Sequence, residues 1–303
     1  MRLDAIVSAF IACSFAANPV QDLVFPITHT SRGIPGITLV TPEGHRHIFQ
    51  IDTRSNGGYL SDSIPDNITS LTIVGSNSLI EVGTDWFAHS SISAALGVIG
   101  VARDSRFARM FPSIMLLPPI SSDGARIIAA PQNPEQHCFG GEISYVETSG
   151  GIVQARVDIV SPQNTVTVPV TSPMAEFVIR TGEANDYIPV PVYAELISII
   201  ASHVRIEFGS STQLMGCTTE LFNVLPTIRF TIARENQNRL MPVENGLQIF
   251  LRPEDYLDMF ENDVCVLRLR EGRIFNVISA NFISKVGIHF DYNHFRVGFC
   301  DPL

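Results

Sequence analysis

Hydrophobic residues along the chain fall into short runs, many of which alternate with polar residues, and Gly, Pro, Asn and Ser separate the runs. Short alternating or continuous apolar runs between turn-forming residues are typical of β-strands. The pattern predicts strands at Gly36–Val40, His47–Ile51, Leu71–Val74, Gly97–Val101, Ile152–Val160, Thr165–Val170, Phe177–Ile179, Ile228–Ile232 and Val286–Phe290. We therefore expect a mostly β protein.

One amphipathic helix interrupts this pattern, from Pro191 to about His203. Proline stands in its first turn, where the missing N–H costs nothing, and Val192, Leu196, Ile199 and Ile200 are spaced to share one face. A second, shorter helix is expected at Phe107–Met115.

Two segments of the chain are alike. Residues 47–55 and residues 175–183 each read as an apolar strand that runs into a polar residue, a threonine and a tight turn. Each is followed later by a second apolar strand with small residues, Leu96–Val101 in the first half and Asn276–Asn281 in the second. One structural unit used twice would explain this repetition.

Composition and charge narrow the possible partners. The chain has 303 residues, 45% hydrophobic and 17% charged, which excludes intrinsic disorder. With 20 Lys and Arg against 30 Asp and Glu, its net charge of −10 argues against nucleic acid and anionic membrane surfaces as partners. No apolar run reaches the length that crosses a bilayer, so no membrane span is expected.

The amino terminus and the cysteines indicate export. Residues 1–16 resemble a signal peptide, with Arg2 near the start, an apolar stretch at Ala5–Phe15, and the small residues Ser14 and Ala16 before a cut after Ala16. A buried amino-terminal strand or helix is the alternative. Removal of this segment leaves four cysteines, Cys138, Cys217, Cys265 and Cys300, whose spacing fits no zinc pattern. We expect two disulfides and a secreted protein.

A series of short motifs in a fixed order narrows the fold further. Near the carboxyl end, Phe275–Ile283 is followed by His289–Asn293 and Arg296–Phe299. Upstream stand Thr41-Pro42, Phe139–Ile143 and Leu225–Phe230. In this order the motifs are similar to those of pepsin-like aspartic peptidases, and they cover nearly all of the chain after residue 16.

The resemblance implies a bilobal fold of two β-barrel-like lobes, residues 17–148 and 149–303, joined by a six-stranded interlobe sheet. It also implies a disulfide between Cys217 and Cys265, where the family carries a bridge in the carboxyl lobe. Cys138 and Cys300 would then pair with each other or remain two separate buried thiols.

The family's peptide hydrolysis depends on two aspartates that share one proton and hold a water between them. Each half of the family's site reads Asp-Thr-Gly followed by Ser or Thr. The matching residues of this chain are Asp52, Thr53, Arg54 and Ser55 in the first half, and Arg180, Thr181, Gly182 and Glu183 in the second. Arginine thus replaces the second aspartate, and an arginine side chain does not lose its proton. We expect Arg180 to form an ion pair with Asp52 and to take the place of the water.

Other positions also depart from the family. Arg54 stands where the family has a glycine, so its side chain has to enter the cleft or shift the turn. Ser279-Ala280 replaces the family's Gly-Asp. The chain between Asp52 and Leu96 is short and has no tyrosine after Tyr59, so the flap hairpin and its tyrosine are expected to be missing, with at most a stub that bears Trp86.

These features predict a catalytically impaired pepsin homologue that binds a peptide or protein in its cleft or on an outer face. The second hypothesis is an active aspartic endopeptidase in which Asp52 works with another acid, from Asp62, Asp66, Asp85 or Asp104, or from a second chain. A third is a scaffold whose cleft the Asp52–Arg180 pair closes.

We expect a monomer without a cofactor. Neither His45 with His47 nor His289 with His294 has a third ligand at a fixed spacing, so no metal site is predicted.

Overall fold

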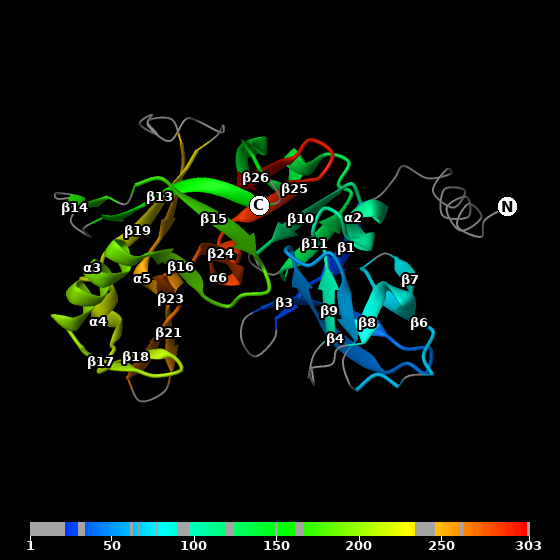
Figure 1. Cartoon of the computed structure of the whole chain (residues 1–303), viewed down its shortest axis with the longest axis horizontal. Helices are drawn as coiled ribbons and strands as arrows, with labels where there is room; N and C mark the ends of the chain where they lie inside the picture. The colour runs from blue at the N-terminus through cyan, green and yellow to red at the C-terminus, as the bar shows by residue number, and fades with distance from the viewer. Residues whose placement is uncertain are drawn as a thin grey trace.

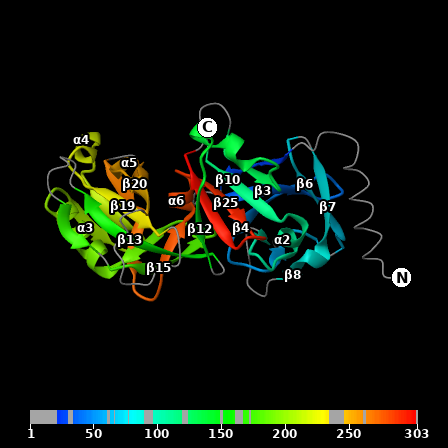
Figure 2. The same cartoon turned by 90° about the horizontal axis from the view of Figure 1, so that it is seen from above.

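The computed structural model describes residues 22–29, 34–60, 63–65, 67–76, 78–89, 97–118, 124–148, 151–160, 167–171, 173–233, 246–260 and 263–301. The chain forms two β lobes that lie side by side with a third sheet between them (Figures 1 and 2). The proposed signal peptide at residues 1–16, with Cys13, lies outside the described residues.

The sheet between the lobes has six strands in the order β1-β11-β10-β25-β26-β12. All of its pairings are antiparallel. The strands come from the start, middle and end of the described chain: β1 (Leu23–Pro26), β10 (Ser113–Leu117), β11 (Arg126–Ala129), β12 (Ser144–Glu147), β25 (Gly287–Asp291) and β26 (Arg296–Cys300). The carboxyl-terminal hairpin β25–β26 therefore sits in the middle of a sheet that the first half of the chain begins.

The first lobe is built on one strongly curved sheet with the strand order β7-β6-β3-β4-β9-β5-β8, to which β2 is added beside β3. Its strands are β2 (Thr28–His29), β3 (Pro35–Val40), β4 (Arg46–Asp52), β5 (Gly58–Leu60), β6 (Ser70–Val74), β7 (Leu79–Gly83), β8 (Phe87–His89) and β9 (Gly97–Gly100).

The second lobe repeats this design with the order β20-β19-β13-β15-β24-β16-β23 and β14 beside β13. Its strands are β13 (Ile152–Val160), β14 (Thr167–Thr171), β15 (Ala175–Arg180), β16 (Asp186–Pro189), β19 (Thr227–Ile232), β20 (Leu247–Leu251), β23 (Leu269–Gly272) and β24 (Asn276–Ser279). A further four-stranded sheet consists of β17 (Arg205–Phe208), β18 (Thr212–Met215), β22 (Val264–Leu267) and β21 (Leu257–Phe260).

The two curved sheets match strand by strand, which explains the repeated sequence pattern. β4 pairs in parallel with β9, as β15 does with β24. The next strand in each lobe, β5 or β16, joins through one antiparallel pair, Tyr59 with Val98 in the first lobe and Tyr187 with Val277 in the second. Asp52 and Arg180 therefore occupy equivalent positions at the ends of β4 and β15.

The expected long helix is present as α3 (Val190–Ala201), and its residues Val192, Leu196 and Ile200 are buried. The second expected helix is shorter than predicted: α2 covers Arg106–Met110, and Ser113 already belongs to strand β10. Pro112 explains the difference, because the residue before a proline is disfavoured in helical conformation. The remaining short helices are η1 (Thr84–Trp86), η2 (Pro134–His137), η3 (Phe139–Gly141), α4 (Thr219–Phe222), α5 (Pro253–Tyr256) and α6 (Ala280–Ile283).

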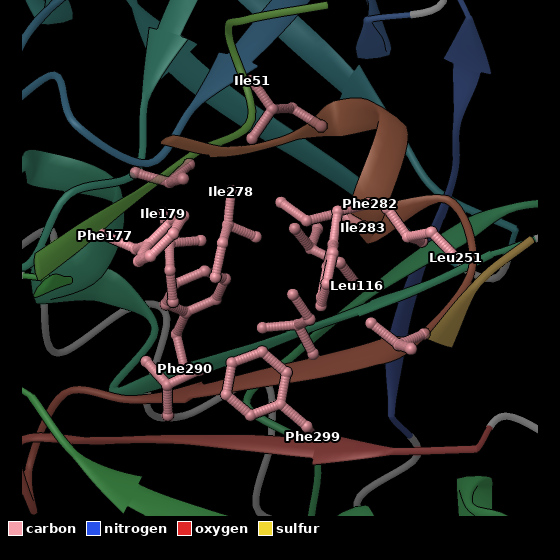
Figure 3. Packing of buried hydrophobic residues seen from close by; sticks show 14 of the residues in the cluster. Ile51, Leu116, Phe177, Ile179, Leu251, Ile278, Phe282, Ile283, Phe290 and Phe299 are labelled. Carbon is pink, nitrogen blue, oxygen red and sulfur yellow. The ribbon is translucent and has the colours of Figure 1, made fainter. Parts of the chain in front are cut away.

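One hydrophobic core runs through both lobes. It joins Ile51 of the first lobe, Ile179 and Ile278 of the second, and Leu116 and Phe290 of the interlobe sheet in a single buried cluster (Figure 3). Each of these side chains is at most 5% exposed. Because burial of a large aliphatic side chain is worth about 1.5–3 kcal/mol, this shared packing holds the two lobes against the sheet between them.

Both expected disulfides are formed. Cys217 and Cys265 are bonded within the second lobe, and Cys138 is bonded to Cys300 across 162 residues of chain. The Cys138–Cys300 bridge packs with Met115 and Ile128 on the face of the interlobe sheet that points away from the main core. It ties the segment with η2 and η3 to the last strand. No helix of the described ranges is long and apolar enough to span a membrane.

Replacement of Cys138 and Cys300 by serine should lower the free energy of unfolding, by up to about 5 kcal/mol in the chain-entropy model, because this bridge closes the longer loop. Urea denaturation of the variant and of a matched Cys217→Ser/Cys265→Ser variant measures the effect. Faster proteolysis within residues 130–142 is expected only for the first variant. An unchanged urea midpoint for that variant would contradict the stabilising role of the bridge.

Candidate active site

The two lobes meet where the turns after β4 and β15 face each other, and four hydrogen bonds join the turns. The Thr53 hydroxyl donates to the Ile179 carbonyl (3.0 Å), and the Thr181 hydroxyl donates to the Ile51 carbonyl (2.6 Å). Each hydroxyl also accepts the opposite backbone N–H, from Thr181 at 3.3 Å and from Thr53 at 3.1 Å. Both threonines are buried. The sequence repetition thus becomes a nearly twofold-symmetric contact.

Asp52 lies beside this contact and is only 8% exposed. Its carboxylate accepts the Arg54 backbone N–H on Oδ1 (2.9 Å) and the Ser55 hydroxyl on Oδ2 (3.0 Å). Two donors from its own turn therefore hold the carboxylate in place.

Arg180 occupies the equivalent position in the second lobe, but its partner is not Asp52. One guanidinium nitrogen lies 3.1 Å from a carboxylate oxygen of Glu183, which is three residues further along the same turn. The buried Nε of Arg180 has no hydrogen-bond partner among the described residues. The expected Asp52–Arg180 ion pair is therefore wrong, because a nearer acid in the same turn takes the guanidinium.

The two turns carry interacting side chains at the same two positions, but the charge at the first of these positions is negative in one turn and positive in the other. In the first turn, Ser55 donates to Asp52 three residues before it. In the second, Glu183 accepts from Arg180, again three residues before it. Arg180 and Glu183 thus occupy, as a paired set, the positions in the second turn that Asp52 and Ser55 hold in the first. Sequence reasoning identified the arginine but did not assign a role to Glu183.

The backbone of the first turn keeps its geometry in spite of Arg54. The Arg54 N–H still reaches Asp52, and the Arg54 side chain is exposed and lines a cavity with Thr53 and Asn56. Of the two alternatives predicted for Arg54, a side chain in the cleft or a shifted turn, the exposed side chain in a cavity agrees better with the first. The glycine of the second turn does have a steric role: a Cβ at Gly182 would come 3.2 Å from the Asp52 carboxyl carbon.

Sequence reasoning missed a second acid near these turns, Asp186. It is fully buried at the start of β16, and its carboxyl group accepts the Ser279 backbone N–H (2.7 Å) and the Asn281 side-chain amide (2.8 Å). Burial raises the pKa of Asp186 to about 6, although hydrogen bonds from Asn281 and Ser279 oppose the shift. Asp186 lies at the same distance along the chain from Arg180 as Gly58 does from Asp52. An alignment of the two repeated segments would therefore have placed Asp186 next to the second turn.

Asp186 also contacts Ser279, the second-lobe residue that corresponds to a glycine of the first lobe. In the first lobe, a Cβ at Gly100 would come 2.3 Å from the Gly57 carbonyl oxygen, so no side chain fits there. Ser279 is the equivalent residue of the second lobe, and it is buried beside Asp186. Its hydroxyl accepts the Asn281 N–H as the N-cap of α6. The acid and the serine therefore fill and connect the base of the second turn.

No hairpin of the described chain closes over Asp52. The hairpin β6–β7 has its tip tied to edge strand β1, where the Ser76 N–H donates to the Val24 carbonyl (2.7 Å). Trp86 lies in η1 and packs against the core of the first lobe. Neither feature covers the two turns, and residues 90–96 lie outside the described chain.

The acids considered as replacements for the second aspartate do not contact Asp52. Asp85 pairs with Arg106, and Asp104 lines the cavity beside Arg54. Asp186, which the sequence did not suggest, is likewise bonded elsewhere, to Ser279 and Asn281. Asp62 and Asp66 lie outside the described residues. The described part of the chain has no cluster of three His, Cys, Asp or Glu side chains able to hold a metal ion.

Comparison with solved structures identifies the fold. The chain superposes on the crystal structure of an aspartic proteinase from Irpex lacteus with a TM-score of 0.64 and 12% sequence identity, over 93% of this chain and 98% of the other. In all, 386 solved chains match. No family model and no curated protein matches the sequence. The fold is that of the pepsin-like aspartic proteinases, as the ordered motifs predicted.

Loss of the Thr181 hydroxyl should destabilise the contact between the turns. Thr181→Val keeps the shape of the side chain but leaves the buried Ile51 carbonyl and the Thr53 N–H without their partner. A loss of about 2–4 kcal/mol in the free energy of unfolding is expected, since each unsatisfied buried group costs about 1–3 kcal/mol. Thr181→Ser, which retains the hydroxyl, is the control. Equal losses in the two variants, measured by chemical denaturation, would show that the hydrogen bonds are unimportant.

Asp186 should make the protein more stable in acid. Its pKa is about 6 in the folded chain, against an ordinary value of 3.8, so the stability that its protonated form provides is complete below about pH 4 and is lost as the pH rises through about 6. This loss amounts to about 3 kcal/mol at neutral pH. Asp186→Asn cannot titrate, so the difference in unfolding free energy between variant and wild type should change by that amount between pH 4 and pH 7. The exposed Asp85→Asn is the control, and parallel pH profiles for wild type and Asp186→Asn would disprove the assignment.

Proposed function

We propose that this chain is a secreted protein of the pepsin-like fold that has lost aspartic peptidase chemistry and binds a peptide or another protein. The ion pair between Arg180 and Glu183, in the position equivalent to Asp52 and Ser55, carries the proposal. It places a permanent cation where the chemistry requires a second carboxyl group.

The chemistry follows from charge. Amide hydrolysis by two acids requires one to be ionised, to activate water, and the other to be protonated, to donate to the carbonyl oxygen. The guanidinium group of an arginine has no hydrogen-bond acceptor and does not lose its proton. Arg180 therefore cannot share a proton with Asp52. Without a second acid, Asp52 has no group with which to divide the two roles.

Binding requires neither acid, because apolar surface and strand edges recognise peptides without proton transfer. A groove of about 310 Å³ runs along the second lobe beside β13 and β15, and Ile152, Met174, Val178, Ile274 and Phe275 contribute its apolar lining. Ile274 is 91% exposed and Phe275 is 49% exposed. Exposed apolar side chains gathered at a groove favour contact with another molecule.

Two disulfides support the secreted location, because such bonds persist in oxidising compartments. The signal peptide at residues 1–16 and a monomeric state are parts of the same proposal.

The purified protein should show no peptide cleavage that depends on Asp52. A peptide library incubated at pH 3–7 and analysed by mass spectrometry measures this, with Asp52→Asn as the matched variant. Cleavage by the wild type that disappears in Asp52→Asn and with a statine inhibitor would overturn the proposal in favour of an active peptidase. Binding of uncleaved library peptides, weakened in Ile274→Ser/Phe275→Ser but not in Asp52→Asn, is the expected positive result, and its absence would overturn the binding role.

A restored site provides the complementary test. Arg180→Asp alone would leave the Glu183 carboxylate beside a new acid, so Glu183→Thr has to accompany it, with Arg54→Gly. Cleavage by this triple variant but not by the wild type would show that the Arg180–Glu183 set blocks the chemistry. Continued inactivity of the folded variant would show that removal of the Arg180–Glu183 set is not sufficient to restore the chemistry.

A further inference from the structure

One triplet of the first lobe has the sequence of an N-glycan acceptor. Asn67-Ile68-Thr69 is the only place in the 303 residues where Asn is followed by a residue other than proline and then by Ser or Thr. It lies between β5 and β6, and Thr69 directly precedes the first residue of β6. Whether such a triplet can be modified depends on how the fold presents it.

The fold anchors the backbone of this triplet. Ile68 is 7% exposed and belongs to the hydrophobic core, and its N–H donates to the Pro65 carbonyl (3.1 Å). The Thr69 carbonyl accepts both the N–H (2.9 Å) and the hydroxyl (3.2 Å) of Thr84, at the start of η1. The middle residue thus points inward, and the backbone after it is fixed to a neighbouring segment.

The two side chains that define an acceptor are presented to solvent. Asn67 and Thr69 are both exposed. Within the described part of the chain, neither the Asn67 amide nor the Thr69 hydroxyl has a hydrogen-bond partner. A glycan is bulky and requires a surface position, which an asparagine in a strand or in the core could not provide. Asn67 meets this condition.

The inference rests on the secreted location in the proposed function, because N-glycans belong to proteins that enter the secretory pathway. The two disulfides favour the same oxidising compartment, and they do so independently of the triplet. An exposed acceptor and two disulfides in one chain therefore agree on where the chain matures.

We propose that Asn67 is an N-glycosylation site, modified by an oligosaccharide that is carried on a lipid diphosphate. The side-chain nitrogen of Asn67 attacks C1 of the first sugar, so that a C1–N bond forms and the C1–O bond to the diphosphate breaks. The nitrogen gives up one of its two protons, and the lipid diphosphate leaves. The Thr69 hydroxyl marks the acceptor, a role that serine also fills.

The glycan stands on the first lobe, whereas the apolar groove proposed for peptide binding is lined by residues of the second lobe. Binding in the groove should therefore be the same with and without the glycan. The modification and the binding role can thus be tested separately.

Mass spectrometry of the full chain, expressed with its own amino terminus in cultured animal cells, tests the proposal. Wild type from the medium should be heavier than the unmodified chain. It should fall to the unmodified mass after treatment with peptide-N-glycosidase, which leaves aspartate at position 67. Asn67→Gln and Thr69→Ala should lack the added mass, whereas Thr69→Ser should keep it. Replacement of Thr69 spares the backbone carbonyl that Thr84 contacts.

A control triplet in the same chain separates the possible failures. Gly209→Asn in the Asn67→Gln background completes Asn-Ser-Ser at an exposed bend of the second lobe, where an added Cβ comes no closer than 3.7 Å to its neighbours. Modification of this variant but not of secreted wild type would overturn the proposal alone. Retention of unmodified wild type in the cytosol would overturn the secreted location together with the glycan.

Discussion

The reciprocal hydrogen bonds between Thr53 and Thr181 set the geometry on which the rest of the site depends. They connect two turns 128 residues apart and give each of the two hydroxyls, two N–H groups and two carbonyls in the buried contact a partner. Because an unsatisfied buried group is costly, neither turn can move without the other. The residues just before the threonines, Asp52 and Arg180, are held in equivalent positions whatever their chemistry.

Because of this constraint, the fold does not depend on which side chains stand at positions 52 and 180. The hydrogen-bonded pair of turns accommodates Asp52 with Ser55 in the first lobe and Arg180 with Glu183 in the second. Each pair interacts within its own turn and does not need a partner from the other lobe. Arg180 therefore does not need Asp52 as a partner, and Asp52 retains the two donors of the first turn. An arginine at position 180 therefore leaves the lobes and the turns in register, because its charge is paired within its own turn.

Much of the fold could be predicted from the sequence. Alternating apolar residues predict the strands, and the repeated strand-turn segments predict that the two lobes contain equivalent sheets. The features that could not be predicted were the end of one helix, the partner of one side chain and the burial of one acid. Pro112 shortened α2, and the partner of Arg180 depended on a side chain within its own turn rather than on the facing lobe. Asp186 was missed because its burial follows from the pairing of β16 with β24, and periodicity alone does not reveal that contact.

The order of strands in the interlobe sheet bears on how the chain reaches its native state during synthesis. β10 pairs on one side with β11, its near neighbour in sequence, and on the other with β25, which begins at Gly287. As the ribosome adds residues from the amino end, β10 presents an open edge until nearly the whole polypeptide has emerged. Unpaired edges invite wrong partners. A nascent chain of this topology therefore exposes the edge of β10 for most of its translation, and the sheet closes only when the last strands have been made.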